Sequence, residues 1–247
     1  MLKLLTYNVL EGAAPDRLPK ALRVMKSANA DVVAVQEARY WRRNGREVFR
    51  RVSRELGMRG VLFKANSGFD IAVFSRLPIL GHANLALETV FLHTTGYLSL
   101  QTDSGLPFHL FATHLRPEYP ARQWETELLL KWVRPRRREY CAMCGDLNSL
   151  TAGDHVARTR LRPGSELRRG PRGVIAMIAR GGWVDCFRHR NPCAPGLTLG
   201  AGRRVARVDY IFASKSLSKR LRGCRVLRHR ELVAASDHSP VWAEFDI

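Results

Sequence analysis

The chain has 247 residues, of which 45% are apolar, so it can bury a substantial core and is too apolar for general disorder. Its formal net charge is +19, from 41 Lys and Arg against 22 Asp and Glu. This excess favours an anionic partner such as nucleic acid, with a membrane phosphate surface or a merely solvated basic exterior as alternatives. No apolar run approaches the roughly 20 residues that span a bilayer. Residues 1–5 lead into Thr6 without a cleavage site, so the sequence predicts a cytoplasmic protein.

Five cysteines occur without the regular spacings of a disulfide framework or a zinc site. Cys141 and Cys144 stand three residues apart in a segment that reads as a buried strand. Side chains at that spacing point to opposite faces of a sheet, which excludes a joint metal site or a disulfide between them. We therefore expect reduced and mostly buried thiols.

The apolar patterning predicts many strands between a few helices. The first strands are expected at 2–9, 31–36, 60–64, 70–75, 80–87, 97–102, 107–113 and 139–144, and the last near 183–187, 205–213, 224–229 and 240–246. Helices are expected at 16–29, 46–56, 120–133 and from about 172 to Gly181, with a long basic loop over 151–172. In the helix at 120–133, Trp124, Leu128 and Trp132 fall along one side.

The order of these elements shows no strict βαβ alternation and no internal repeat, and no linker divides the chain. It predicts an α+β fold in which mixed sheets pack face to face with helices outside. We expect a single domain over residues 1–247.

Polar side chains mark six of the predicted strand ends. They are Asn8, Glu37, His114, Asp146 with Asn148, Asp209, and Asp237 with His238. A lone histidine there is more often structural, and a lone glutamate is usually a solvated cap. Carboxylates, amides and imidazoles together are what a hard cation and an acid–base apparatus require, so the set predicts hydrolysis at a phosphorus centre.

The motifs around these positions form an ordered series. They are Thr6-Tyr7-Asn8-Val9, Gln36-Glu37, Phe74-Ser75-Arg76-Leu77-Pro78, Thr113-His114-Leu115, Gly145-Asp146-Leu147-Asn148, Asp209-Tyr210-Ile211-Phe212 and Ser236-Asp237-His238-Ser239-Pro240. The series resembles that of the endonuclease/exonuclease/phosphatase (DNase I-like) superfamily over residues 3 to 246. The resemblance implies a four-layer αββα sandwich and a phosphoesterase that uses a divalent metal, usually Mg²⁺ and alternatively Mn²⁺.

The resemblance also implies roles for single residues. Glu37 is similar to the family's metal-binding glutamate, with Asn8 and Asp237 close to the same ion. His238 resembles the histidine that activates water or steadies the phosphate, with Asp209 orienting its ring. The remaining matches are Asp146 and Asn148, for the nucleophile and phosphate oxygens, and His114, for the leaving group or a phosphate oxygen. Whether His238 or Asp146 is the general base, and whether one or two metals bind, stays open.

The chain departs from the family pattern beyond the first strand. AP endonucleases and tyrosyl-DNA phosphodiesterases usually carry an aspartate two residues after the asparagine, where this chain has Leu10 followed by Glu11. This difference counts against those two subfamilies and not against activity.

Basic residues cluster in three places, and two of these follow predicted site motifs. The first is Arg39, Arg42, Arg43 and Arg46, interleaved with Tyr40 and Trp41; the second is the six arginines between Arg158 and Arg172; the third runs from Lys215 to Arg230. Arg39 and Arg42 could track a phosphate backbone while Tyr40 or Trp41 stacks on a base. The alternative is a solvated rim with Trp41 packed under its own loop. The third cluster reads as a solvated face away from the chemistry.

The sequence therefore predicts a metal-dependent phosphodiesterase, a nuclease acting on DNA or RNA. The alternative within the same fold is a phospholipid or sphingomyelin phosphodiesterase, or a phosphomonoesterase. A lipid enzyme needs an exposed apolar edge, for which residues 89–97 are the one candidate. A non-catalytic nucleic-acid-binding module would be expected to lack Glu37, Asp146, Asp209 or His238, and all four are present.

Overall fold

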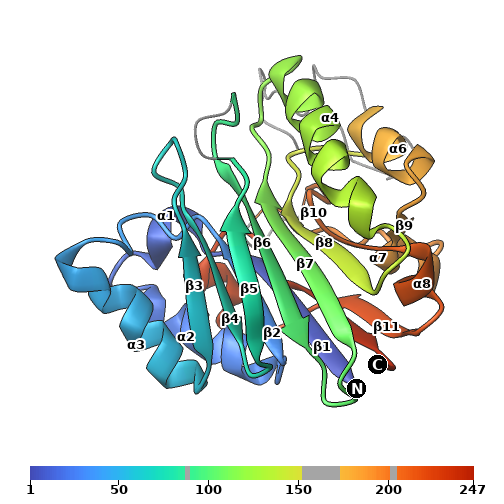
Figure 1. Cartoon of the computed structure of the whole chain (residues 1–247). Helices are drawn as coiled ribbons and strands as arrows, with labels where there is room; N and C mark the ends of the chain where they lie inside the picture. Colours follow the sequence, from blue (N-terminus) through green and yellow to red (C-terminus); the bar gives the residue numbers. More distant parts are fainter. Residues whose placement is uncertain (87–89, 152–172, 201–204) are drawn as a thin grey trace.

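Two six-stranded mixed sheets lie face to face in the computed structural model, which describes residues 1–86, 90–151, 173–200 and 205–247 (Figure 1). The first sheet has, in spatial order, β11 (Leu221–Val226), β12 (Val241–Phe245), β1 (Leu2–Asn8), β2 (Val32–Gln36), β4 (Ile71–Ser75) and β3 (Arg59–Phe63). The second has β5 (Ile79–Asn84), β6 (Thr94–Gln101), β7 (Pro107–His114), β8 (Cys141–Asp146), β10 (Asp209–Ala213) and β9 (Val184–Asp185). Each sheet contains one parallel pair, β1 with β2 and β7 with β8.

Most of the helices cover the outer faces of the sheets, whereas two short ones, at 186–190 and 215–218, contribute Phe187 and Leu217 to the core between the sheets. Those described are α1 (Leu10–Ala13), α2 (Leu18–Ser27), α3 (Glu47–Leu56), α4 (Ala121–Val133), α6 (Gly173–Arg180), α7 (Cys186–Arg190), α8 (Lys215–Ser218) and α9 (Leu232–Ala235), with the 3-10 turns η1 (Asn44–Arg46) and η2 (Arg134–Arg136). Helices α2 and α3 pack on the first sheet, and α4 and α6 on the second (Figure 1). The expected four-layer αββα sandwich is confirmed. None of these helices is long and apolar enough to cross a membrane.

Alternation along the central strands builds the layers. In β1, Leu2 and Leu4 enter the core between the sheets, whereas Leu5 and Tyr7 face the helices. In β8, Cys144 lies in the core between the sheets and Cys141 in the core beneath α4 and α6, so the two thiols point to opposite faces as expected. Because these strands are apolar on both faces, their polar groups gather at the ends.

Two expectations for single elements were wrong. The segment at 186–190 is the short helix α7, because Asp185 caps it by accepting from Arg188 N at 3.1 Å. The strand expected over 205–213 begins only at Asp209. The helix expected at 120–133 is α4. Trp124 is 60% exposed there, and the buried residues are Arg122, Glu125, Thr126, Leu129 and Val133.

Candidate active site

Strand topology brings the predicted polar residues to one end of both sheets. The parallel pairs place Asn8 beside Gln36 and His114 beside Asp146, so four strands end together. Strand β10 runs the opposite way and begins there, with Asp209 opposite Asp146. Asn8 reaches across from the first sheet, donating from Nδ2 to Asp146 Oδ2 at 3.1 Å. We call this edge the catalytic end.

An aspartate–histidine pair lies at its centre. The two side chains are buried, and His238 Nδ1 lies 2.8 Å from Asp209 Oδ2. The other ring nitrogen, Nε2, is 3.8 Å from Asp146 Oδ2 and 3.9 Å from Asp237 Oδ1. Burial lowers the pKa of His238, but the carboxylates of Asp209, Asp146 and Asp237 outweigh it and raise that pKa to about 10. The ring is therefore oriented by one carboxylate and presents its second nitrogen to the others.

Asp146 is the carboxylate that the other groups share. Its Oδ1 accepts from Asn148 N at 2.8 Å, and Oδ2 lies 3.7 Å from His114 Nε2. Burial, followed by the negative charge of Asp209, raises the pKa of Asp146 to about 7. A carboxyl group at this pKa can exchange a proton near neutrality, which suits acid–base chemistry.

Glu37 lies in the tight loop that follows β2. Hydrogen bonds hold this loop against the residues that follow β1. Its carboxylate accepts from Asn8 Nδ2 at 3.0 Å and from Glu11 N at 2.7 Å. The loop closes through Gly12, whose N donates to Glu37 O at 2.7 Å. A Cβ on Gly12 would meet Arg39 O at 2.2 Å, and its φ is +77°, so only glycine fits there. Glu11 itself points away and lies 3.6 Å from the Arg39 guanidinium.

Two stacked imidazoles form the other side of the centre. His114 stacks on His93 with ring centroids 4.0 Å apart, and Ser67 Oγ lies 2.8 Å from His93 Nδ1. Burial and, secondarily, Arg116 lower the pKa of His93 to about 4. Burial also puts the pKa of His114 well below its usual range, so both rings are neutral at pH 7. Asn148 Nδ2 lies 3.4 Å from His114 Nε2 and donates to Leu115 O at 2.9 Å.

Sequence reasoning missed His93, Ser67 and two charged residues of α4 that support this end. Arg122 is buried and donates to Asn148 O at 2.5 Å and to Pro117 O at 2.6 Å. Glu125, also buried, accepts from Leu92 N at 2.7 Å, next to His93. The sequence feature that could have identified Arg122 and Glu125 is a charged residue at a core-facing position of a helix. Such a residue is rarely buried without polar partners.

The donor set fits a hard divalent cation. Ligand atoms of Asp146, Asp209 and His238 lie within 4.8 Å of one another, and Glu37 adjoins them through Asn8. Several carboxylates buried together repel one another, and a bound cation would offset that repulsion. This grouping differs from the expected set of Asn8, Glu37 and Asp237. Asn8 joins Glu37 to Asp146, whereas the Asp237 side chain is 39% exposed and faces His238.

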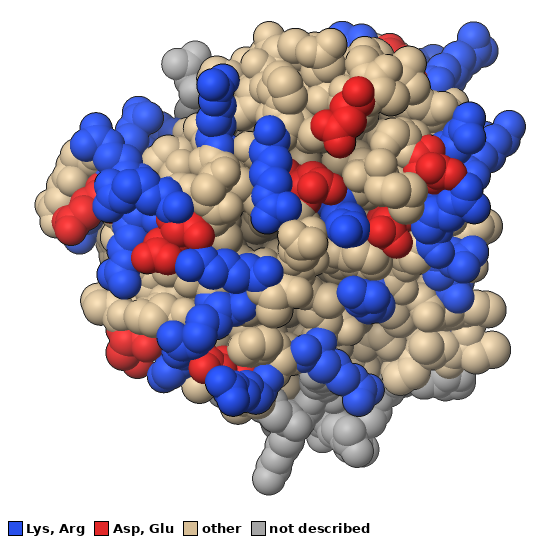
Figure 2. All heavy atoms as spheres, turned by 90° about the horizontal axis from the view of Figure 1, so that it is seen from below, with Lys and Arg blue, Asp and Glu red and all other residues tan. Residues whose placement is uncertain are grey.

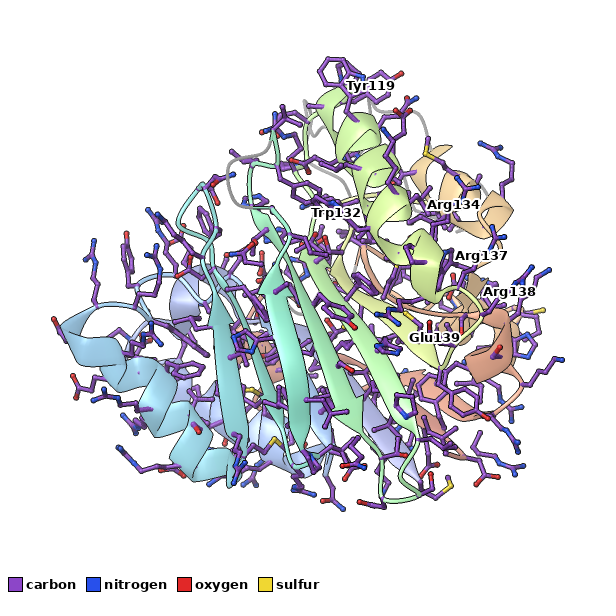
Figure 3. The ribbon with its side chains drawn as sticks, viewed as in Figure 1. Tyr119, Trp132, Arg134, Arg137, Arg138 and Glu139 are labelled. Atoms are coloured by element: carbon purple, nitrogen blue, oxygen red, sulfur yellow. The ribbon has the colours of Figure 1, made fainter. Side chains whose placement is uncertain are left out.

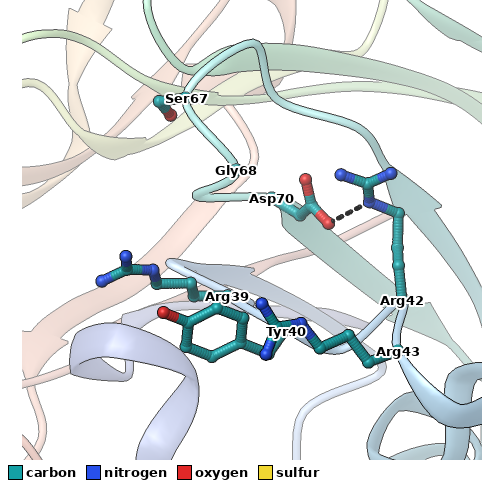
Figure 4. A pocket seen from close by; sticks show the side chains of 7 residues that line it. All are labelled: Arg39, Tyr40, Arg42, Arg43, Ser67, Gly68 and Asp70. Carbon is teal, nitrogen blue, oxygen red and sulfur yellow. Dashed lines mark hydrogen bonds and ion pairs between the residues drawn. The ribbon is translucent and has the colours of Figure 1, made fainter.

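A basic pocket adjoins the catalytic end, and we call it the arginine–tyrosine pocket. It measures about 410 Å³ and is lined by Arg39, Tyr40, Arg42, Arg43, Ser67, Gly68 and Asp70 (Figure 4). Tyr40 is 46% exposed, with the Arg43 and Arg39 guanidinium carbons 4.0 and 4.7 Å from its ring centroid. Arg42 pairs with Asp70 at 2.6 Å. Ser67 links the pocket to His93, and Arg39 stands two residues from Glu37.

Trp41 does not line this pocket, which corrects its expected role in base stacking. Its side chain is 1% exposed, and Nε1 donates to Gly12 O at 2.9 Å. Trp41 therefore packs under its own loop and supports the Glu37 turn. The second arginine cluster, between Arg158 and Arg172, lies outside the described residues.

Comparison with known proteins agrees with this geometry. A sequence model described as the Endonuclease/Exonuclease/phosphatase family matches residues 5–238. The chain belongs to that family. It is accordingly a phosphoesterase of the endonuclease/exonuclease/phosphatase type. No curated protein matches it in sequence.

Solved structures of other family members share its fold. An AP endonuclease from Archaeoglobus fulgidus is 20% identical, with a TM-score of 0.76 and 100% of each chain covered. A 3′ phosphatase from Neisseria, bound to product DNA hairpin, is 18% identical with a TM-score of 0.76, again over 100% of each chain. A family protein from Bacteroides thetaiotaomicron is 19% identical with a TM-score of 0.72, over 100% of this chain and 98% of that one.

Proposed function

We propose that the protein is a phosphodiesterase that depends on Mg²⁺ or Mn²⁺ and cleaves nucleic acid. The observation that carries this proposal is the arginine–tyrosine pocket beside the catalytic end. Its cations suit backbone phosphates, and an exposed tyrosine suits a stacked base. The similar Neisseria 3′ phosphatase, which has product DNA bound, supports nucleic acid as the substrate class.

In this proposal Glu37 would hold the cation. Asn8 joins it to the cluster of Asp146, Asp209 and His238, and Asp237, which faces His238, would complete the set expected from the sequence. The metal, when bound, supplies positive charge that offsets the charge developing on the phosphate. Asp209 fixes the His238 ring through Nδ1, so Nε2 holds or accepts a proton facing Asp146. The neighbouring carboxylates raise the pKa of His238 to about 10, so the ring holds its proton near neutrality. Asp146, whose pKa is about 7, is therefore the group placed to take the water proton.

The other side of the centre steadies the phosphate. Neutral His114 and the Asn148 amide lie together beside Asp146, in reach of the oxygens of a phosphate bound there. His93 restricts the His114 ring by stacking on it. Arg122 restricts Asn148 by holding its carbonyl oxygen. Positioning of this kind limits reorganisation during the reaction.

A lipid substrate has less support from the described residues. In the candidate membrane edge, Phe91 is 1% exposed and packs against Trp132, with ring centroids 5.4 Å apart and the rings tilted. Val90 is 72% exposed, but a single exposed valine is not an apolar patch. A phosphomonoester remains the second candidate, because the centre itself would accept a terminal phosphate as well as an internal one.

The test is a substrate panel with Mg²⁺, with Mn²⁺ and with EDTA. It compares single- and double-stranded DNA, abasic DNA, RNA, a 3′-phosphorylated oligonucleotide and a sphingomyelin analogue. We expect metal-dependent cleavage of at least one nucleic acid, and release of phosphate without strand cleavage would favour the monoesterase. Turnover of the sphingomyelin analogue alone would overturn the proposal. Glu37→Gln serves as the inactive control.

A further inference from the structure

A second cationic pocket lies at the opposite ends of the strands that carry the catalytic aspartates. It measures about 300 Å³ and is lined by Arg137, Arg138, Gly181, Gly182, Lys215 and Ser216. We call it the distal pocket. Asp146 ends β8 and Asp209 begins β10, whereas Arg138 precedes β8 and Lys215 follows β10. At about 3.3 Å per residue, the length of β8 puts the distal pocket roughly 20 Å from Asp146.

The three cations of the distal pocket have no acidic partner among the residues that the structure describes. Arg137, Arg138 and Lys215 are exposed and form no ion pair with any residue in the described ranges. The neighbouring acid, Glu139, is engaged elsewhere, with His109 Nε2 at 2.6 Å and Arg136 at 3.1 Å. Figure 3 shows Arg134, Arg137 and Arg138 in succession beyond α4, with Glu139 beside them. Like charges that share a pocket without a counter-charge favour an anion there.

Hydrogen bonds fix the two segments that carry these cations. Ser214 N donates to Cys141 O at 2.8 Å, and Ser214 Oγ donates to Glu139 O at 2.6 Å. Ser216 Oγ donates to Arg138 O at 2.7 Å. The third wall is the Gly181–Gly182 turn, where the absence of side chains leaves room beside Lys215. The backbones that carry the three cations are therefore held together before any ligand arrives, which lowers the entropic cost of binding.

We propose that the distal pocket binds phosphate groups. Their source is either the backbone of a nucleic acid engaged at the catalytic end or a free phosphate compound such as pyrophosphate. The backbone source rests on the proposed function. For a strand stacked at 3.4 Å per nucleotide, a separation of roughly 20 Å corresponds to on the order of six nucleotides. A tetranucleotide held at the catalytic end cannot reach the distal pocket, whereas a 20-mer can.

The test replaces all three cations, as Arg137→Gln, Arg138→Gln and Lys215→Gln in one variant. The matched control is Arg51→Gln, Arg54→Gln and Arg59→Gln, which removes three exposed cations of α3 and β3 and lowers the net charge equally. Binding of a fluorescent single-stranded 20-mer is measured by anisotropy in EDTA over a range of salt concentrations. Pyrophosphate binding is measured by calorimetry in the same buffer.

If the phosphates come from a nucleic-acid backbone, the plot of log K against log salt should be less steep for the distal variant than for wild type. The negative slope should shrink in magnitude by about 2, at about 0.7 per phosphate contact on a single strand. The control should keep the wild-type slope. In Mg²⁺, the distal variant should raise KM for the 20-mer and leave KM for a tetranucleotide unchanged. If the ligand is a free phosphate compound, wild type and the control should bind pyrophosphate equally, and the distal variant should not bind it.

If the distal variant and the control behaved alike in both binding assays, the proposal that the distal pocket binds phosphate would be overturned. Absence of any nucleic-acid hydrolysis by wild type would instead overturn the proposed function. The binding assays in EDTA still decide the distal pocket in that case, so the two failures are distinguishable.

Discussion

The two ends of the same strands carry opposite chemistry. At the catalytic end, Asp146 and Asp209 are buried within a hydrogen-bonded network of imidazoles and amides. At the other end, Arg137, Arg138 and Lys215 are exposed and pair with no acidic residue in the described part of the chain. Figure 2, which views the molecule from below, shows Lys and Arg spread widely over the face seen there, with Asp and Glu among them. Buried charges shift each other's pKa values and can do proton chemistry, whereas exposed cations contribute only screened attraction.

The largest effect should come from the polar groups of the catalytic end. Glu37→Gln and His238→Ala should each lower kcat by about 10²–10⁴-fold, because they remove metal binding and acid–base catalysis. Steady-state kinetics in Mg²⁺ measures the loss, and circular dichroism checks folding. Glu127→Gln, an exposed acid on α4, should behave as wild type. Full turnover in either active-site variant would contradict the conclusion that the catalytic end performs the chemistry.

Two adjacent aromatic residues should separate stability from binding. Trp41→Ala should lower the free energy of unfolding by about 3–5 kcal/mol, because the side chain is buried and supports the Glu37 loop. Tyr40→Ala should leave stability almost unchanged and weaken single-strand binding by about 1–3 kcal/mol through lost stacking. Urea unfolding and oligonucleotide anisotropy measure the two quantities. Tyr40→Phe, which keeps the ring, is the control that should retain affinity.

The buried histidines should make stability depend on pH. The pKa of His93 is about 4 in the folded state, below its usual 6.5, so the unfolded state binds more protons between these values. The contribution of His93 to the free energy of unfolding is therefore fully present above pH 6.5 and is lost as pH falls towards 4. Between pH 7 and pH 5, His93 should account for a loss of about 2 kcal/mol. Urea unfolding of wild type and His93→Phe should differ in pH dependence by this amount, and parallel curves would contradict it.

The smallest effect should come from isolated surface charge. Arg23→Gln breaks an exposed ion pair with Glu231, at 2.7 Å, that is remote from both pockets. We expect it to leave the melting temperature almost unchanged, because solvent screens such pairs. Thermal unfolding measures this. A large loss of thermal stability would show that exposed ion pairs stabilise this fold, contrary to the contrast drawn between its two ends.

Much of the fold and of the candidate active site could be read from the sequence. Strands with apolar residues on both faces, each ending in a polar group, predicted a layered sheet structure with its chemistry at strand ends. The ordered motifs from Asn8 to His238 gave the family, which the family match confirms. Local errors arose where a side chain overrode the pattern, as when Asp185 capped a helix in place of a continuing strand.

Period-two alternation and motif order are local properties, so the sequence by itself determined the layers, the family and the set of polar residues. Only the tertiary structure decided which groups meet. It buried Trp41, stacked His93 on His114, and brought Arg122 of α4 to the carbonyl of Asn148. It also gathered the cations of the distal pocket from segments far apart in the chain. These contacts depend on long-range pairing of strands and helices, which no local pattern encodes.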